Sequence, residues 1–372
     1  MTIDFTKLAV SGVQGLRAYQ PGKPVDELAR EYGLNPADIV KLASNENPMG
    51  PSDKALAAIQ AEFTDLTRYP DGNGFDLKSA LSKSLDVTME QLTLGNGSSD
   101  ILEFIVKCFV AKDDDVIVSQ HAFAIYGLVT KTVGGNLIQV PAKNWGHDLP
   151  AMAAAITDKT KIIFVTNPNN PTGTWNSKTE LESFLKAVPS NVIVLLDEAY
   201  FEYVGEAEYP SGIDYLSQYP NLVVTRTFSK AYGLASLRVG YGVSSPELAD
   251  VMNRVRPPFN VNSFALAAAT ASVKDKGYVN KSKALNDIGM KQLQDGFDYL
   301  GLTWIPSVGN FICFEVPGKA MQINQGLLEN GVIVRAVANY EMPNHLRVSI
   351  GTEKENEIFL AKLKLLLEQQ DK

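Results

Sequence analysis

The sequence is poor in the side chains that form disulfide bonds and bind metals, with only 2 cysteines and 3 histidines in 372 residues. Cys108 and Cys313 lie far apart, lack CxxC spacing and stand among apolar residues, so we expect buried free thiols in a reducing compartment. No histidines are spaced as metal ligands, and we expect no metal site. The N-terminus has no basic start before an apolar core, and no apolar run is long enough to span a bilayer. These absences predict a cytoplasmic location.

The sequence also has fewer basic than acidic residues. The 34 Lys and Arg residues stand against 42 Asp and Glu residues, a formal net charge of -8. Such a charge argues against non-specific binding to nucleic acid or to an anionic membrane. The composition, 45% hydrophobic and 20% charged, is that of a folded protein, and a chain of 372 residues exceeds what one hydrophobic core usually supports. We therefore expect about two domains and small-molecule partners.

Short apolar, β-branched runs recur through the middle of the chain, separated by segments of helical length. Runs that are apolar on both faces and spaced in this way are typical of a parallel sheet covered by helices. The sequence therefore predicts an α/β fold for this region. The runs span residues 116–118, 137–140, 161–166, 192–197, 222–225 and 240–243.

The pattern of expected helices and strands changes after the paired prolines Pro257 and Pro258. We expect a hinge there, because these prolines cannot continue a helix. Beyond them, long helical stretches and a few short strands predict a smaller α+β domain. We expect a large domain over residues 49–258 and a small one over residues 259–372. Residues 1–48 have little periodicity and are expected to form an arm that packs with the small domain.

In open α/β sheets, ligands bind at the carboxyl ends of the strands, so the residues there are candidates for chemistry. Ser98 and Ser99 follow a short strand and a Gly-Asn-Gly turn, and their hydroxyl and N–H groups at a helix N-terminus suit a phosphate. A plain helix cap would look the same. Phe123 and Tyr126 follow another strand, where an aromatic ring is either part of the core or a platform for a flat ligand.

Three further strand ends carry polar groups. Asn170 lies in a turn with two prolines, which fix the backbone direction and aim its amide. Asp197 ends a buried apolar strand, where a carboxylate requires a cation or a donor, and Tyr200 adds a polar group at the same edge. A structural salt bridge would meet the same need.

Lys230 lies in the last of these loops, between Thr227 and Arg238. An exposed surface lysine is the plain alternative. One ligand, however, requires a phosphate site, a stacking face, a donor to a ring oxygen, a carboxylate for a ring nitrogen and a nucleophilic amine. That ligand is pyridoxal 5'-phosphate, with Lys230 as the amine that forms a Schiff base.

The order of these motifs resembles that of the fold-type I aminotransferases over nearly the whole chain. The resemblance implies a mostly parallel seven-stranded sheet, a dimer and a Schiff-base lysine at Lys230. It also implies that Asp197 partners the pyridine nitrogen, that Tyr200 and Asn170 donate to the ring hydroxyl, and that Phe123 stacks on the ring. Ser98, Ser99, Thr227 and Arg238 match the phosphate-binding residues, and Tyr69 matches a tyrosine that reaches the phosphate of the neighbouring subunit.

Within that superfamily the sequence is most similar to the histidinol-phosphate aminotransferases of histidine biosynthesis. The supporting segments are residues 19–24, 41–50, 68–71, 309–311, 331–335 and 346–351. The resemblance implies that Arg335 and Arg347 line the substrate pocket and that Tyr19 and Asn47 close over it. It further implies histidinol phosphate and 2-oxoglutarate as substrates, with imidazole-acetol phosphate and glutamate as products.

The sequence departs from the family pattern at two places. Phe123 stands where a tyrosine often stacks, and Leu266 stands where glutamine is frequent. An aromatic-amino-acid aminotransferase stays an alternative, because two arginines suit a carboxylate as well as a phosphate. A lyase or decarboxylase on the same fold is a second alternative. A regulator's effector domain is a third, although the chain has no basic stretch or extra domain for binding DNA.

Overall fold

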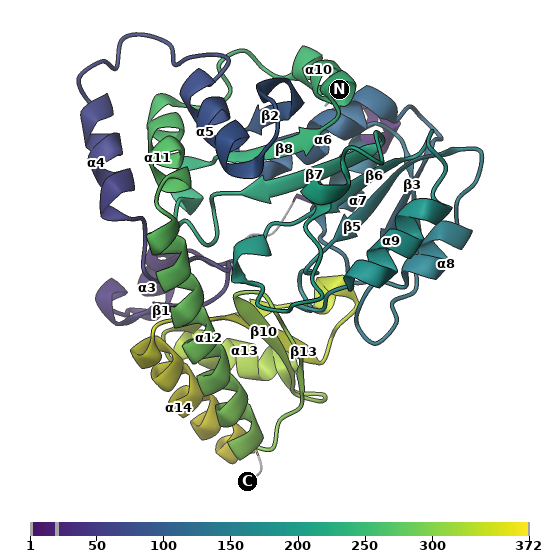
Figure 1. The fold of residues 1–372 in the computed structure, drawn as a ribbon. Coiled ribbons are helices and arrows are strands. Elements are labelled where there is room, and N and C mark those ends of the chain that lie inside the picture. The colour runs from purple at the N-terminus through teal and green to yellow at the C-terminus, as the bar shows by residue number, and fades with distance from the viewer. Residues whose placement is uncertain (1–2, 19–21, 371–372) are drawn as a thin grey trace.

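The six predicted apolar runs form all but one strand of a seven-stranded sheet in the computed structural model, which describes residues 3–18 and 22–370 (Figure 1). The strand order is β2-β8-β7-β6-β5-β3-β4, and β8 alone runs opposite in direction to the other six strands. The α/β class and the mostly parallel sheet are thereby confirmed. The strands are β2 (Leu92–Gly95), β3 (Asp115–Ser119), β4 (Asn136–Val140), β5 (Thr160–Thr166), β6 (Ile193–Asp197), β7 (Leu222–Thr227) and β8 (Gly240–Ser244).

Helices cover both faces of this sheet, because the central strands are apolar on both sides. In β6, Val194 and Leu196 point into one core with α8 and α9, whereas Ile193 and Leu195 point into the other with α6, α7 and α10. The covering helices are α6 (Ser98–Phe109), α7 (Ile125–Thr132), α8 (Leu149–Ala154), α9 (Lys178–Ala187) and α10 (Pro246–Val255).

A second core belongs to the small domain, at the bottom of Figure 1. Its antiparallel sheet has the order β12-β13-β10-β9, and α12, α13 and α14 complete it. The elements are β9 (Trp304–Ile305), β10 (Phe311–Glu315), β12 (Arg335–Ala336), β13 (His345–Ser349), α12 (Lys276–Tyr299), α13 (Ala320–Glu329) and α14 (Glu353–Gln370).

The N-terminal arm contributes to the small domain. Its strand β1 (Val40–Lys41) pairs in parallel with β11 (Val332–Ile333), and Val40 and Leu42 are buried in the small domain's core. In the described part of the arm, β1 is preceded by the α-helices α1 (Phe5–Leu8), α2 (Ser11–Gln14) and α3 (Val25–Tyr32) and by a 3-10 turn at Pro36–Asp38. The arm therefore packs with the small domain and also contacts the large domain, where the carbonyl of Ser44 accepts a hydrogen bond from Lys230.

The boundary expected at residue 258 does not coincide with a change of core. Helix α11 (Ser263–Val273) packs against α4 (Asp53–Glu62) and α5 (Phe75–Leu85), and three of its alanines, Ala265, Ala268 and Ala269, are buried in the core of the large domain. Small side chains permit this close helix packing, so an alanine-rich segment after the prolines still belongs to the large domain's interior.

Cys108 is partly buried and Cys313 fully buried, and both are free thiols. Among the described helices, none is long and apolar enough to cross a membrane. Within residues 3–18 and 22–370, no three metal-binding side chains come together.

Candidate active site

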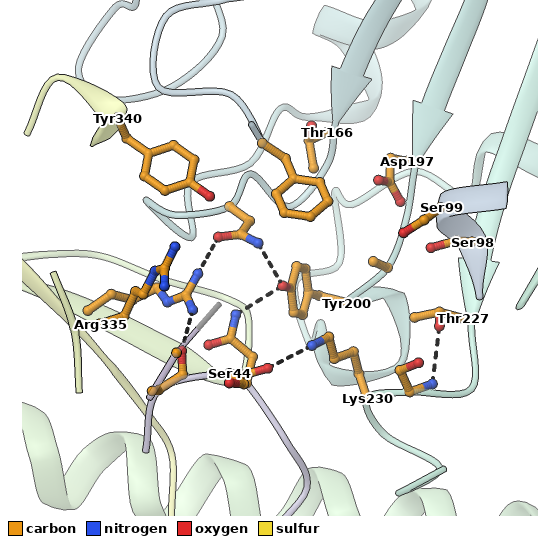
Figure 2. A pocket seen from close by; sticks show the side chains of 18 of the residues that line it. Ser44, Ser98, Ser99, Thr166, Asp197, Tyr200, Thr227, Lys230, Arg335 and Tyr340 are labelled. Atoms are coloured by element: carbon orange, nitrogen blue, oxygen red, sulfur yellow. Dashed lines mark hydrogen bonds between the residues drawn. The ribbon is translucent and has the colours of Figure 1, made fainter. Parts of the chain in front are cut away.

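A cavity of about 300 Å³ lies where the carboxyl ends of β5, β6 and β7 face the small domain. In Figure 2, Lys230 and Tyr200 occupy the middle, with Ser98, Asp197 and Thr227 on one side and Arg335 on the other. Most of the residues predicted from the sequence line this cavity: Ser98, Ser99, Phe123, Asn170, Asp197, Tyr200, Thr227, Lys230, Arg238, Arg335 and Arg347.

Lys230 is positioned by the turn that follows β7. Its Nζ donates a hydrogen bond to the carbonyl oxygen of Ser44, 2.9 Å away in the N-terminal arm. Burial, with the nearby charge of Arg347, lowers the pKa of Lys230 to about 7. Near neutral pH a large fraction of this amine is therefore unprotonated, which a nucleophile or a general base requires.

Asp197 ends β6 and is only 3% exposed. Its two carboxylate oxygens accept hydrogen bonds from Tyr126 Oη at 2.8 Å and from Thr225 Oγ1 at 3.0 Å. Burial raises the pKa of Asp197, and these two donors oppose that rise by favouring the ionised form. No salt bridge of Asp197 is present among the described residues, so a cationic group in the cavity is the partner that this carboxylate suits.

The hydroxyl of Tyr200 sits in a network of amides. Asn170 Nδ2 donates to it at 3.1 Å and Asn45 Nδ2 at 2.9 Å. Arg347 in turn donates from Nη1 to Asn170 Oδ1 and from Nη2 to the carbonyl of Ala43, 2.8 Å away. Burial raises the pKa of Tyr200 to about 12, so the phenol keeps its proton. Because both amides donate to its oxygen, its own O–H is available to a ligand.

An anion site forms beside the N-terminus of α6. Arg238 Nη1 donates to Ser229 Oγ at 3.2 Å and to the carbonyl of Ala235 at 3.1 Å. A Cβ added to Gly97 would lie 2.4 Å from Arg238 Nη2, so glycine is required there for the guanidinium to approach the helix end. A helix N-terminus, hydroxyls and a guanidinium together suit a phosphate group.

Two of the predicted residues that the structure describes, Asn47 and Tyr69, do not line this cavity. Asn47 is buried elsewhere, with Nδ2 donating to the carbonyl of Ala231 and to Ser282 Oγ, both at 2.9 Å. Tyr69 is 81% exposed and stacks on Phe259, with ring centroids 4.7 Å apart. Tyr19 lies outside the described residues.

The structure also brings in residues that the sequence did not single out. Ser44 and Asn45 enter from the arm, and Tyr340 enters from the small domain with its ring facing the cavity (Figure 2). Thr166 ends β5 beside Asp197, and Tyr126 lies behind Asp197. Tyr126 is the exception, because the sequence already marks it, with Phe123, as an aromatic residue that follows β3, and the structure buries it in the core. Tyr340 has no such signal, because tertiary packing alone brings it to the cavity.

The fold and this cavity define a fold-type I enzyme of the pyridoxal phosphate class, because the lining residues fit each part of that cofactor: phosphate, ring nitrogen, ring hydroxyl and aldehyde. The sequence profile of the family described as aminotransferase class I and II matches residues 37–363. Histidinol-phosphate aminotransferase 2 of Pseudomonas fluorescens is 59% identical over 367 residues, which cover 99% of each chain. The protein of the same name from Pseudomonas aeruginosa is 59% identical over 97% of this chain and 98% of its own.

A solved structure supports the same grouping. The histidinol-phosphate aminotransferase of Sinorhizobium meliloti, in complex with pyridoxal-5'-phosphate, superposes with a TM-score of 0.89 at 28% identity, over 97% of this chain and 98% of that one. The chain belongs to the class I and II aminotransferases and, within them, to the histidinol-phosphate aminotransferases.

Proposed function

We propose that this protein transfers the amino group of histidinol phosphate to 2-oxoglutarate, with pyridoxal 5'-phosphate as its cofactor. The products are imidazole-acetol phosphate and glutamate, and the step belongs to histidine biosynthesis. The observation that carries the proposal is a single cavity that joins an amine of lowered pKa, Lys230, to an anion site on each side. The names of the relatives that are 59% identical supply the particular substrate.

The bound cofactor supplies an electron sink next to the carbon that loses its proton. Lys230 Nζ is the base for that proton, because its lowered pKa leaves a large fraction of it unprotonated near pH 7. Asp197 offers a negative charge to the ring nitrogen, and Tyr200 offers its O–H to the ring oxygen. The side chains Ser98, Ser99, Thr227 and Arg238 hold the cofactor's phosphate, and Phe123 covers the ring.

Arg335 and Arg347 are the groups that we propose for the substrate's own anion. Arg347 is buried and lines the cavity, and each of its Nη atoms donates one hydrogen bond to the described residues, so a second N–H on each is available to an oxyanion in the cavity. A forked guanidinium binds the phosphate of histidinol phosphate and the carboxylate of 2-oxoglutarate by the same geometry.

That shared geometry also supports a second candidate, an aromatic-amino-acid aminotransferase. Phe123 and Tyr340 give the cavity aromatic walls, which suit a phenyl ring as well as an imidazole ring. The test is kcat/KM for histidinol phosphate and for phenylalanine, with 2-oxoglutarate as acceptor. We expect histidinol phosphate to be preferred. A preference for phenylalanine would instead favour the aromatic-amino-acid aminotransferase. Turnover without any keto acid would instead indicate a lyase or decarboxylase.

We further propose a homodimer in which Tyr69 reaches the partner's phosphate site. Tyr69 projects from a well-ordered loop: Asp71 accepts hydrogen bonds from the N–H groups of Asn73 at 2.9 Å and Phe75 at 2.6 Å. Its ring stacks on the exposed Phe259, and Phe63, Leu66 and Phe75, which lie close to it in the sequence, are also exposed apolar side chains. Contiguous exposed apolar surface is typical of a protein interface. We propose a cytoplasmic location for this small-molecule enzyme.

Subunit mixing tests the dimer. K230A and Y69A chains, each poorly active alone, are unfolded together and refolded. A mixed dimer then has one site with both native residues, so activity returns above that of either parent. If no activity returns, or if the protein sediments as a monomer, Tyr69 does not complete a neighbouring site.

A further inference from the structure

A fully buried tyrosine lies directly behind Asp197. Tyr126 on α7 stacks on Phe164 of β5, with ring centroids 4.5 Å apart and planes 9° from parallel. Its Oη lies 2.8 Å from Asp197 Oδ2 and 2.7 Å from Thr166 Oγ1. Tyr126 is absent from the lining of the main cavity, so it touches the carboxylate from the side away from the ligand.

The direction of each hydrogen bond in this chain follows from counting protons. Burial raises the pKa of the Tyr126 phenol well above its ordinary value, so it stays protonated. A phenol has one proton, which goes to Asp197, and its oxygen then accepts the proton of Thr166 Oγ1. Thr225 Oγ1 donates to the other carboxylate oxygen at 3.0 Å. Both oxygens of Asp197 therefore receive a donor from the protein.

This arrangement matters because burial alone raises the pKa of Asp197 and favours its neutral form. Each donated hydrogen bond stabilises the ionised form instead. We propose that Tyr126, supported by Thr166, is a positioning residue that keeps Asp197 ionised and oriented, so that the ring nitrogen of the bound cofactor stays protonated. This inference rests on the proposed function, because it concerns the same cofactor.

The test compares pyridoxal 5'-phosphate binding by the wild type and by Y126F, which removes one oxygen and keeps the ring on Phe164. We expect the dissociation constant to rise about tenfold, since a hydrogen bond to a charged group is lost. We also expect the pH midpoint of the holoenzyme's visible absorbance change to rise. In Y126F the ring nitrogen carries less positive charge, so it disfavours the protonated form of the Lys230 nitrogen less strongly. The Lys230 nitrogen therefore loses its proton at a higher pH.

Two further variants complete the design. T166V removes only the donor to Tyr126, so it should move both quantities in the same direction by a smaller factor. Y215F is the matched control, because Tyr215 is also buried but its hydroxyl donates to Glu182 Oε1 at 3.1 Å, away from the cavity. It should leave both quantities at the wild-type values.

A merely structural role for Tyr126 would weaken binding without moving the absorbance midpoint, and that result would overturn the inference. So would Y126F behaving like Y215F. If Y126F does not fold, T166V decides by the same two measurements. Failure of the proposed function looks different, since the wild type would then neither bind the cofactor nor transfer an amino group.

Discussion

The two ends of the active-site cavity are built in different ways. The cofactor end, which comprises Ser98, Asp197, Thr227, Lys230 and Arg238, lies entirely within the large domain, at strand and helix ends around one sheet. The substrate end, which comprises Ala43, Arg335, Tyr340 and Arg347, is assembled from the arm and the small domain. Under the proposed function, the residues assigned to the chemistry therefore lie in one domain, whereas the residues assigned to recognition of the amine lie on segments that only tertiary packing brings together.

At the cofactor end, removal of the Lys230 amine should have the largest effect on turnover. K230A is expected to lower turnover by about 10⁴-fold or more, because one group serves as both nucleophile and base. The visible absorbance of the lysine-bound cofactor should also be absent. The exposed Lys186 on α9 provides the control, and K186A should resemble the wild type in rate and spectrum. A K230A protein that retained both signals would refute the assignment of Lys230.

At the substrate end, R347Q is expected to lower kcat/KM by about 100-fold for both histidinol phosphate and 2-oxoglutarate, because a buried charge that pairs with an oxyanion is lost. The cofactor's absorbance should stay near the wild-type value, which separates the two ends. R335Q is the comparison, and we expect about a tenfold loss because Arg335 is less buried than Arg347. Loss of the cofactor from R347Q would show that the ends cannot be separated in this way.

The two ends are nevertheless coupled through charge. The positive charge of Arg347 is the second cause, after burial, of the lowered pKa of Lys230. Cofactor capture by the apoenzyme requires the neutral amine, so its rate should rise with pH to a plateau, with a midpoint near 7. R347Q removes a positive charge that disfavours the protonated form of Lys230. The pKa of Lys230 should therefore rise, and the midpoint should move to higher pH. Stopped-flow absorbance measures it, and an unmoved midpoint would contradict the coupling.

The same contrast explains what could be predicted from the sequence. Residues of the cofactor end follow apolar runs, and the rule that ligands gather at strand ends locates them without knowledge of the packing. The amide donors Asn45 and Asn170 converge on Tyr200 from segments far apart in the chain, and only Asn170 is marked by a local turn pattern. Tyr340 is placed by a short helical turn of the small domain, which no local periodicity announces.

The burial of α11 shows a second limit. Its alanine content predicts a helix, which the structure confirms at Ser263–Val273, but alanine has no strong preference for either core. The packing partners α4 and α5 precede it by almost 200 residues, so the side on which it packs depends on tertiary structure. A domain boundary inferred from a change in the pattern of elements is therefore predicted less accurately than a strand inferred from an apolar run.

Asn47 belongs to neither end, and its substitution should have the smallest effect on activity. Its amide joins the arm to the loop of Lys230 through the carbonyl of Ala231, and to α12 through Ser282, while its Oδ1 accepts from the N–H of Met49 at 3.0 Å. N47A should cost about 1 to 3 kcal/mol of unfolding free energy, because buried partners lose their hydrogen bonds. KM for histidinol phosphate should change little.

Thermal or urea unfolding measures this loss, with N47D as the matched variant. Aspartate keeps an acceptor for the N–H of Met49 and can accept from the hydroxyl of Ser282, but it cannot donate to the carbonyl of Ala231, so N47D should lose only the bond to the loop. If N47A instead raised KM strongly at unchanged stability, Asn47 would belong to the substrate end, as the family resemblance implies. The arm would then have to move when substrate binds, because Asn47 lies outside the cavity in this structure.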